Sequence, residues 1–383
     1  MKRLLLINSV CGIGSTGRIC ADIAREYEAN GYEVKIANGR SEKIGEGTEK
    51  YAVKIGNRLD LYSHVAMTRL FDRHGLASKH ATRKFLKWAD EYDPDILWLH
   101  NIHGYYINYE LLFDWIKIRQ KEQSESGKPV MEVKWTLHDC WAFTGHCSHF
   151  TYVGCDKWKT GCNDCPQKKE YPACMWFDNS ADNYSRKKRV FAGVENLTII
   201  TPSRWLEGLV KESFLGDYHT EVIYNTIDKT IFKLTPSEFR STHHIRDDQV
   251  IVLGVASIWS TRKGLDDFIK LSNMLAEDED DGYRLVLVGL STEQAMAVPA
   301  GVLCIPKTGN AMELAKIYSA ADVFVNLTYE DTFPTVNLEA ESCGTRVITY
   351  DTGGCRETVN RNDSMVVPTG DLDQVYKVIT ENK

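Results

Sequence analysis

Two acidic positions late in the sequence have the spacing of a site that binds hydroxyl groups. Asp331 and Glu339 are eight residues apart in the segment LTYEDTFPTVNLEAESCGTRVITYDTGG, and Glu330 directly precedes Asp331. Carboxylates accept several hydrogen bonds, which suits the neighbouring hydroxyls of a sugar. The alternative for any one of these residues is an acid in a solvated loop or at a helix N-terminus, where the helix dipole stabilises it.

The same segment predicts the elements that position these acids. A strand ends near Thr328, a turn passes through Phe333 and Pro334, and a helix starts at about Thr335. The backbone amides around Thr335 would lie at the N-terminus of that helix, where they can bind phosphate.

A glycine-rich loop lies near the start of the chain. The segment CGIGSTG (Cys11–Gly17) follows an apolar strand, and its glycines allow positive φ and a close approach to a ligand. Ser15 or Thr16 is expected to cap the helix that follows, to about Asn30. A loop that contacts phosphate or sugar and a plain strand-to-helix turn both fit this pattern. A nicotinamide-nucleotide site is disfavoured, because Asn38–Gly39 stand where an acid would bind the ribose.

Cysteines are concentrated in one segment. Of eleven cysteines, six lie between Cys140 and Cys174, in a stretch over 140–178 that has neither helical nor strand periodicity. Such a long loop needs a staple or a function, and a CxxC pair is half of a common tetrahedral zinc site. We expect a structural zinc, with reduced thiols and a redox or disulfide role as the alternatives. The predicted ligands are Cys147, Cys155, Cys162 and Cys165, with His146, His149 and Cys174 as spare ligands.

The composition excludes other classes of protein. The 383 residues carry 46 Lys and Arg against 53 Asp and Glu, a formal net charge of −7. This balance argues against a nucleic-acid partner, including a zinc-finger module that binds nucleic acid. No apolar run approaches the ~18 residues of a membrane span. The first apolar run is also shorter than the roughly 7–15 residues of a signal-peptide core, so we expect a cytoplasmic protein.

Strands and helices alternate in two series, which predicts an α/β fold with two doubly wound parallel sheets. A polar, irregular stretch over 228–249 separates the series, so we expect domains at 1–230 and 231–383. Ligands of such sheets bind outside the carboxyl ends of the strands. The strands are expected at 3–10, 32–37, 96–100, 133–137, 197–202, 221–224, 250–257, 283–289, 302–305, 323–327 and 346–350.

Several segments resemble the retaining family 4 glycosyltransferases, a nucleotide-sugar-dependent group with the GT-B fold. They are the spacing of Asp331 and Glu339, its CGTRVITYDTGG continuation, ASIWSTRKGLDDFI, VIYNTIDKTIF, LHNIHGYYIN and WTLHDCWAFTGHC. The last two strings look most like enzymes of bacterial capsule, colanic-acid and lipopolysaccharide assembly. The resemblance implies two Rossmann-like domains that face each other across a cleft. Domain 1–230 would bind the acceptor and carry the Cys-rich loop, and domain 231–383 would bind the nucleotide sugar.

The resemblance also implies a donor site. Lys263 matches the lysine that grips the donor diphosphate, while the usual arginine position is Ile258 here and Arg262 is the substitute. The loop Ile305–Thr308 corresponds to the region that holds the base. Asp331, or Glu330 beside it, would touch the donor sugar, and Glu339 the ribose. The implied donor-binding residues are Gly14, Arg262, Lys263, Glu330, Asp331, Phe333, Pro334, Thr335, Val336 and Glu339.

In the first domain, the resemblance implies a reaction centre and an acceptor side. His138 in TLHD matches the histidine of the reaction centre, and a histidine that is bonded only to backbone is the alternative. Asn101, His103 and Asp139 are the acceptor-side residues, and a turn role is equally open for Asn101 and His103. The implied catalytic residues are His138, Asp331 and Lys263.

The implied activity is transfer of a hexose from UDP- or GDP-hexose to a glycan, lipid-linked in bacterial surface polysaccharide assembly, with retention of configuration. The departing diphosphate would take the acceptor proton, and no catalytic metal is expected because the sequence has no DxD motif. The alternatives are a nucleotide-sugar epimerase, a phosphorylase, and a non-catalytic, zinc-stabilised protein that binds sugar. Peripheral contact with the inner membrane is expected through residues such as Arg83, Lys87 and Trp88. Family members usually continue into a helix that crosses back to the first domain, so the last expected helix, over 371–382, indicates a truncated or reduced crossing helix.

Overall fold

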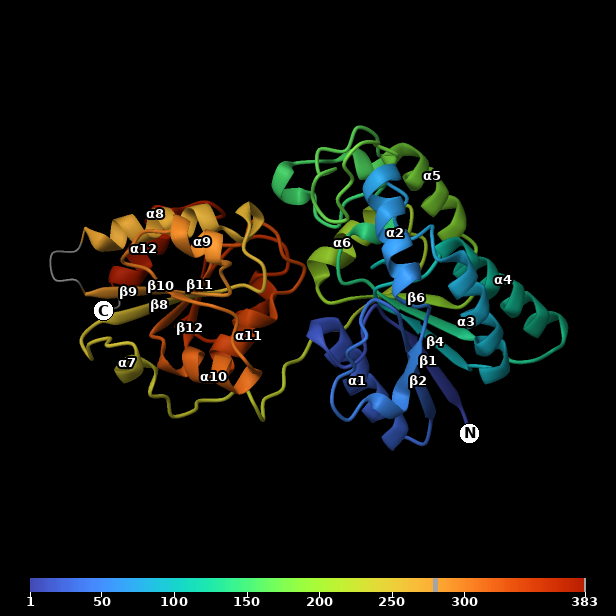
Figure 1. Ribbon diagram of the computed structural model, residues 1–383, viewed down its shortest axis with the longest axis horizontal. Helices are drawn as coiled ribbons and strands as arrows, with labels where there is room; N and C mark the ends of the chain where they lie inside the picture. Colours follow the sequence, from blue (N-terminus) through green and yellow to red (C-terminus); the bar gives the residue numbers. More distant parts are fainter. Residues whose placement is uncertain (278–281, 382–383) are drawn as a thin grey trace. The chain divides into compact units, whose positions relative to one another are not determined.

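The computed structural model describes residues 1–277 and 282–381 and comprises two compact units, Met1–Tyr224 and Asn225–Lys383 (Figure 1). The division expected from the sequence lies at 230/231. The last predicted helix extends to Asn382, which lies outside the described residues.

The first unit is built on a seven-stranded parallel sheet with the order β3-β2-β1-β4-β5-β6-β7. Its central strands are continuous apolar runs, as expected for strands that are buried on both faces. The strands are β1 (Arg3–Ile7), β2 (Glu33–Asn38), β3 (Ala52–Lys54), β4 (Ile96–Leu99), β5 (Glu132–Thr136), β6 (Leu197–Thr201) and β7 (His219–Val222).

Alternate residues of the strands pack against helices on the two faces of this sheet. Leu4 and Leu6 of β1 share a core with α1, whereas Leu5 and Ile7 share a core with α3, α4, α5 and α6. The helices are α1 (Gly14–Ala29), α2 (Arg58–Phe71), α3 (Lys79–Tyr92), α4 (Tyr109–Glu125), α5 (Ser180–Phe191) and α6 (Arg204–Glu212). The prediction that Ser15 or Thr16 caps α1 is wrong, because the helix already begins at Gly14 and no side chain caps it.

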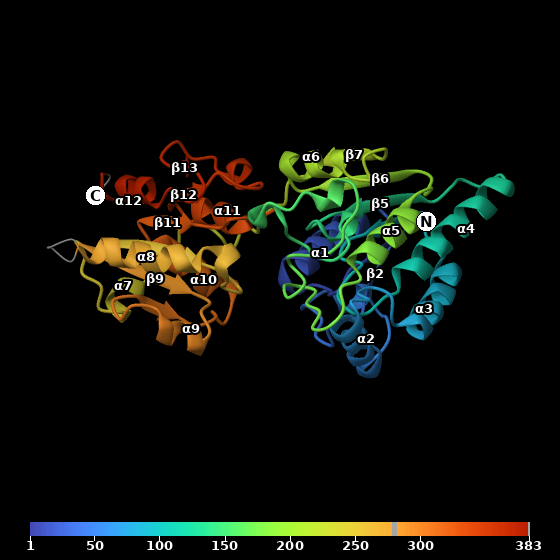
Figure 2. The same cartoon turned by 90° about the horizontal axis from the view of Figure 1, so that it is seen from above.

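The segment between β5 and α5 contains the clustered cysteines and is irregular (Figure 2). Its only regular elements are short 3-10 turns, η2 (Trp141–Phe143), η3 (Thr151–Val153) and η4 (Lys157–Lys159). The absence of periodicity in the sequence therefore predicted this segment correctly.

The second unit is built on a six-stranded parallel sheet with the order β10-β9-β8-β11-β12-β13. Helices α8 and α12 share a core with one face, and α7, α10 and α11 with the other (Figure 1). The strands are β8 (Val250–Val255), β9 (Tyr283–Val288), β10 (Leu303–Ile305), β11 (Val323–Asn326), β12 (Arg346–Tyr350) and β13 (Met365–Val367). The helices are α7 (Phe239–Thr242), α8 (Leu265–Ala276), α9 (Thr292–Ala297), α10 (Ala311–Ala320), α11 (Thr335–Ser342) and α12 (Leu372–Thr380), and the remaining 3-10 turns are η1 (Glu49–Tyr51), η5 (Thr261–Lys263) and η6 (Arg356–Thr358).

Each sheet has one point where the direction of winding reverses. In the first unit it lies between β1 and β4, and in the second between β8 and β11. The loops after these strands diverge there, which leaves room for a ligand. Within the described parts of the chain, no helix has the length and apolar character needed to cross a membrane.

Candidate functional site

The loop after β8 carries the predicted cationic pair of the second unit. Arg262 and Lys263 end the turn η5, and Gly264 then starts α8 with a φ of +73°. A Cβ on Gly264 would lie 2.1 Å from the carbonyl oxygen of Leu327, directly after β11. Only glycine therefore lets the loops after β8 and β11 pack this closely.

Lys263 forms an ion pair with Asp331 between these two loops. Nζ of Lys263 contacts Oδ2 of Asp331, and the side chains are 22% and 18% exposed. Beside them, Nη1 of Arg262 donates to the backbone carbonyl of Glu330 at 2.5 Å. The side chain of Glu330 is fully buried, so Asp331 is the member of the acidic pair that has surface accessible to a ligand.

The position of Asp331 is fixed by backbone contacts. The amide of Gly354 donates to its carbonyl oxygen at 2.9 Å, and the amide of Phe333 donates to its Oδ1 at 3.1 Å. Gly353 has a φ of +55°, and a Cβ there would lie 1.9 Å from the carbonyl oxygen of Asp331. The TGG sequence after β12 thus holds the carboxylate in place.

Helix α11 begins next to this carboxylate with an uncapped N-terminus. Pro334 is the N-cap residue, no side chain caps the helix, and its first turn has no acid. Phe333 and Pro334 are buried, while Thr335 and Val336 are half-buried. The amides at this end can therefore donate to an anion, which the helix dipole also favours.

Glu339 lies one turn into α11 and is oriented by a buried tyrosine. The hydroxyl of Tyr318, on α10, donates to Oε2 of Glu339 at 3.2 Å. Burial raises the pKa of Tyr318 well above its usual value, and the charge of Glu339 raises it further. The phenol therefore stays protonated and continues to donate to the carboxylate.

In the first unit, the glycine loop lies beside the residues that follow β4. Buried Asn8 donates to the carbonyl oxygen of Val10 at 2.8 Å and accepts from the amide of Asn101 at 3.3 Å. Gly14 has a φ of +64°, and no other part of the described chain lies within 4 Å of where its Cβ would be. The loop is thus anchored on one side and open on the side of Gly14.

His138 lines a cavity at the carboxyl ends of β4 and β5. Its Nε2 lies 3.0 Å from Nδ1 of His100, in a hydrogen bond between the rings. Burial lowers the pKa of His138 to about 4; Asp139 opposes this shift and His103 adds to it. At neutral pH the imidazole is therefore uncharged and can both donate and accept a hydrogen bond.

The other predicted acceptor-side residues line the same cavity, and His103 links three segments there. Its Nε2 lies 3.2 Å from Oδ2 of Asp139, and its Nδ1 lies 3.2 Å from the hydroxyl of Tyr171. Burial by itself would raise the pKa of Asp139, but His103, His149 and the amide of Trp141 together hold it below its usual value. Asp139 is therefore a carboxylate that positions His103.

Two residues of this site were not predicted from the sequence: His100, which lines the cavity, and Tyr171, which is bonded to His103. His100 directly follows β4 and precedes Asn101. Its position at the carboxyl end of a predicted strand could therefore have marked it as a candidate. Tyr171 lies in the irregular segment, more than thirty positions after His138, and no spacing rule connects it to His103.

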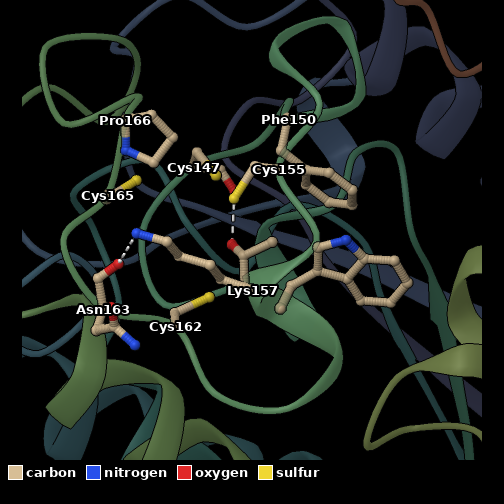
Figure 3. Close-up of a pocket in the computed structure, with 10 residues that line it drawn as sticks. Cys147, Phe150, Cys155, Lys157, Cys162, Asn163, Cys165 and Pro166 are labelled. Atoms are coloured by element: carbon tan, nitrogen blue, oxygen red, sulfur yellow. Dashed lines mark hydrogen bonds between the residues drawn. The ribbon is translucent and has the colours of Figure 1, made fainter.

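The four predicted zinc ligands also line one cavity, separate from that of His138 (Figure 3). All four are free cysteines. Within residues 1–277 and 282–381, however, no three His, Cys, Asp or Glu side chains already form a ligand set for a metal ion.

These arrangements offer two kinds of chemistry. The second unit combines a lysine, an uncapped helix N-terminus and two carboxylates, a set that suits a ligand with phosphates and hydroxyls. The first unit offers a neutral histidine beside a histidine–carboxylate pair, which can orient or polarise a hydroxyl.

Comparison with known proteins finds a family model that matches part of the second unit. Residues 249–381 match the family model described as Glycosyl transferases group 1. The Escherichia coli K12 colanic acid biosynthesis glycosyl transferase WcaC is 29% identical over 193 residues, which are 50% of this chain and 45% of the relative. A Campylobacter jejuni N,N'-diacetylbacillosaminyl-diphospho-undecaprenol alpha-1,3-N-acetylgalactosaminyltransferase is 28% identical over 145 residues, 36% of this chain and 37% of the relative. The chain thus spans less than half the length of these curated relatives.

The fold extends over the whole chain. The structure of Anabaena HepE in complex with UDP-glucose matches with a TM-score of 0.60 at 16% identity, over 100% of this chain and 89% of that chain. A structural match at such low sequence identity supports the fold alone. The predicted class, two parallel α/β sheets of the GT-B type, is confirmed.

Proposed function

Because residues 249–381 match the group 1 glycosyltransferase family, we propose that the chain is a glycosyltransferase that uses a nucleotide-sugar donor. More specifically, it transfers a hexose from UDP- or GDP-hexose, with retention of configuration, to a lipid-linked glycan in bacterial surface polysaccharide assembly. The observation that carries the proposal is the meeting of Lys263, Asp331 and the N-terminus of α11 at the reversal point of the second sheet.

Each part of that site fits one part of the donor. Lys263 and the amides near Thr335 would bind the diphosphate, and Asp331 would leave its ion pair to accept from sugar hydroxyls. Glu339, held by Tyr318, would accept from the ribose hydroxyls. The complex of HepE with UDP-glucose supports this class of donor.

The reaction would proceed on one face of the sugar. The bond between the anomeric carbon and the phosphate oxygen breaks, and the acceptor oxygen forms its bond to that carbon on the same side. The leaving diphosphate takes the acceptor proton while Lys263 and the helix N-terminus stabilise its charge. His138 would orient a hydroxyl as a neutral hydrogen-bonding group, with Asn101, His103 and Asp139 on the acceptor side.

The acceptor class is drawn from the relatives. The name of the E. coli relative refers to colanic acid biosynthesis, and that of the C. jejuni relative to a diphospho-undecaprenol acceptor. Both support a glycan acceptor, and the second supports a lipid-linked one.

A lipid-linked acceptor calls for contact with a membrane surface, which we assign to α2 and the chain beside it. Phe71 stacks on Phe177 with ring centroids 5.8 Å apart, whereas Trp88, expected to be exposed, stacks on Tyr92. Such exposed apolar side chains next to cations favour a membrane interface. The exposed apolar residues here are Leu59, Tyr62, Met67, Phe71, Met175, Trp176 and Phe177, with Arg58 and Arg69 exposed among them.

Vesicle sedimentation tests this surface. Trp176→Ser should reduce the fraction bound to anionic vesicles, while Met296→Ser, which changes an equally exposed side chain of the second unit, should not. Equal binding of the two variants would exclude the assignment.

A transfer assay tests the activity. The full chain is incubated with radiolabelled UDP- and GDP-hexoses and a bacterial lipid extract. If the chain transfers the sugar, radiolabel should appear in the lipid phase and free nucleoside diphosphate should be released. NMR of the product then gives the anomeric configuration. Conversion to an epimeric nucleotide sugar without release of nucleotide would instead indicate an epimerase.

A further inference from the structure

Four cysteines from separate parts of the irregular segment meet at one cavity of the first unit. Cys147 follows η2, Cys155 follows η3, and Cys162 and Cys165 follow η4. Figure 3 shows their sulfur atoms facing the same space. A segment without helices or strands has brought together the four thiols, which are reduced.

Apart from the indole N–H of Trp158, which can only donate a hydrogen bond, the other polar side chains at this cavity already have partners. The hydroxyl of Thr144 donates to the carbonyl oxygen of Cys147 at 2.5 Å. Nζ of Lys157 donates to the carbonyl oxygens of Asn163 and Asp164 at 3.1 and 3.0 Å. Phe150, Trp158 and Pro166 complete the lining, so sulfur is the ligand type that the cavity presents.

Backbone amides point at two of the sulfurs. The amide of Gly145 donates to Sγ of Cys162 at 3.2 Å, and the amide of Gln167 donates to the sulfur of Cys165. A Cβ on Gly145 would lie 2.1 Å from the carbonyl oxygen of Ser180 and 2.7 Å from Cβ of Cys162. Such N–H donors stabilise metal-bound thiolates from outside the ligand shell.

A buried cation next to the thiols points independently to a negative centre. Lys187 is 1% exposed, and its Nζ donates to the carbonyl oxygens of Trp141 and Thr144 at 2.6 and 3.0 Å. It makes no ion pair with any carboxylate of the described chain. The groups that act on its charge from a greater distance are Cys162, Cys147, Asp139 and Asp72. Burial disfavours the charged form of this lysine, and no carboxylate of the described residues lies within ion-pair distance to offset that cost. A zinc ion bound by four thiolates carries a net charge of −2 and would supply a counter-charge.

We propose that Cys147, Cys155, Cys162 and Cys165 bind one structural zinc ion. Two thiols are already close, since Cys147 and Cys165 are hydrogen-bonded to each other. Sulfurs of a tetrahedral site lie about 3.8 Å apart for a Zn–S bond of about 2.3 Å, so zinc binding requires the four sulfurs to converge on a common point.

The zinc site would stabilise the segment that completes the cavity of His138. Trp141 precedes the four ligands and Tyr171 follows them, and Tyr171 is bonded to His103. Loss of the metal should therefore loosen the acceptor side of the first unit without touching the donor residues of the second.

Metal analysis of the full chain, purified without chelators, tests the proposal. We expect about one zinc ion per chain, and Co²⁺-loaded protein should show the ligand-field absorption of a tetrahedral thiolate site. Cys162→Ser should lose the zinc, whereas Cys174→Ser, a buried cysteine of the same segment that does not line the cavity, should keep it.

The wild-type measurement decides the matter even if Cys162→Ser fails to fold. A chelator should lower the melting temperature of the wild-type chain and leave that of the zinc-free Cys162→Ser chain unchanged. Wild-type protein without zinc and without a Co²⁺–thiolate spectrum would overturn the proposal. Full retention of zinc by folded Cys162→Ser would overturn it as well.

Discussion

His138 is the residue whose proton state decides what the cavity of the first unit can do. It shares a hydrogen bond with His100 and has a pKa lowered by burial to about 4. A protonated imidazole could only donate, whereas the neutral ring can also accept from a hydroxyl. In the proposed transfer reaction, His138 would therefore act in its neutral form throughout the physiological range.

Histidine NMR tests this state directly. In protein labelled on histidine, the resonance of His138, assigned with His138→Asn, should keep the position of a neutral ring from about pH 8 down to about pH 5. Exposed His219 serves as the comparison on the same spectra. A His138 midpoint near its ordinary value of about 6.5 would contradict the account.

Tyr318 gives a test on the donor side. Tyr318→Phe removes the hydroxyl that orients Glu339 but keeps the ring in the core. We expect nucleotide affinity to fall about ten-fold or more, since a hydrogen bond to a charged group contributes about 1.5–3 kcal/mol. Titration calorimetry measures this, with Tyr376→Phe on α12 as the control. Unchanged affinity in Tyr318→Phe would mean that Glu339 does not depend on this contact.

Individual residues of the candidate sites were predictable from the sequence where they lie in a local motif. Asp331 and Lys263 lie in loops between a strand and a helix, and Glu339 lies one turn into a helix; the sequence marks all three positions. The structure brings Lys263 and Asp331 into contact. The burial of Glu330 and the contact between Tyr171 and His103 depend on tertiary packing, which no spacing in the sequence encodes.

At the element scale, the loops after β8, β11 and β12 pack together at the proposed donor site. Gly264 lies against the loop after β11, and Gly353 lies against Asp331. These close contacts join three loops that come from different parts of the second unit. The geometry of the carboxylate thus depends on glycines that touch no ligand themselves.

Gly264→Ala tests this dependence. The residue has a φ of +73°, and the new Cβ would lie 2.1 Å from a backbone oxygen. We expect a loss of about 1–3 kcal/mol in the free energy of unfolding, together with loss of nucleotide affinity. The control is Gly301→Ala, where no described atom lies within 4 Å of the new Cβ. If chemical denaturation and calorimetry give the same values for both variants, the loop packing does not control the site.

Most elements of the sheets were predictable because buried parallel strands are short apolar runs between turn signals. The bounds of β12 were predicted as the structure has them, over 346–350, and α11 begins at Thr335, where the helix was expected to start. Strands β3 and β13 were missed, because each is an edge strand of three residues that lacks the apolar run of a central strand.

At the scale of the whole molecule, buried neutral histidines make the first unit sensitive to acid. His64 is fully buried, accepts from the amide of Gly75 at 2.9 Å through Nε2, and has a pKa lowered by burial to about 3. Unfolding exposes it at an ordinary pKa of about 6.5. The unfolded chain then binds more protons than the native one, so stability is lost as the pH falls from 6.5 toward the native pKa.

Denaturation at several pH values tests this linkage. Tryptophan fluorescence reports mainly on the first unit, which holds eight of the nine tryptophans. Below about pH 6, His64 should contribute a fall of about 1.4 kcal/mol in the free energy of unfolding per pH unit. His64→Gln should flatten this slope, and His219→Gln, a change of an exposed histidine, should not. Identical slopes in all three proteins would refute the assignment.

The central claim is that the second unit binds the donor through the residues at the reversal point of its sheet. Calorimetric titration with UDP, GDP and their hexose conjugates tests it most directly, on the wild-type chain, Lys263→Ala and Lys270→Ala. Lys270 lies on α8, pairs with Asp267 and is largely exposed, so it is a matched control. The account predicts that the wild-type chain and Lys270→Ala bind one of these nucleotides equally, and that Lys263→Ala loses about 10- to 100-fold in affinity, as expected for a charged hydrogen bond. Absence of nucleotide binding, or equal affinity in Lys263→Ala, would contradict it.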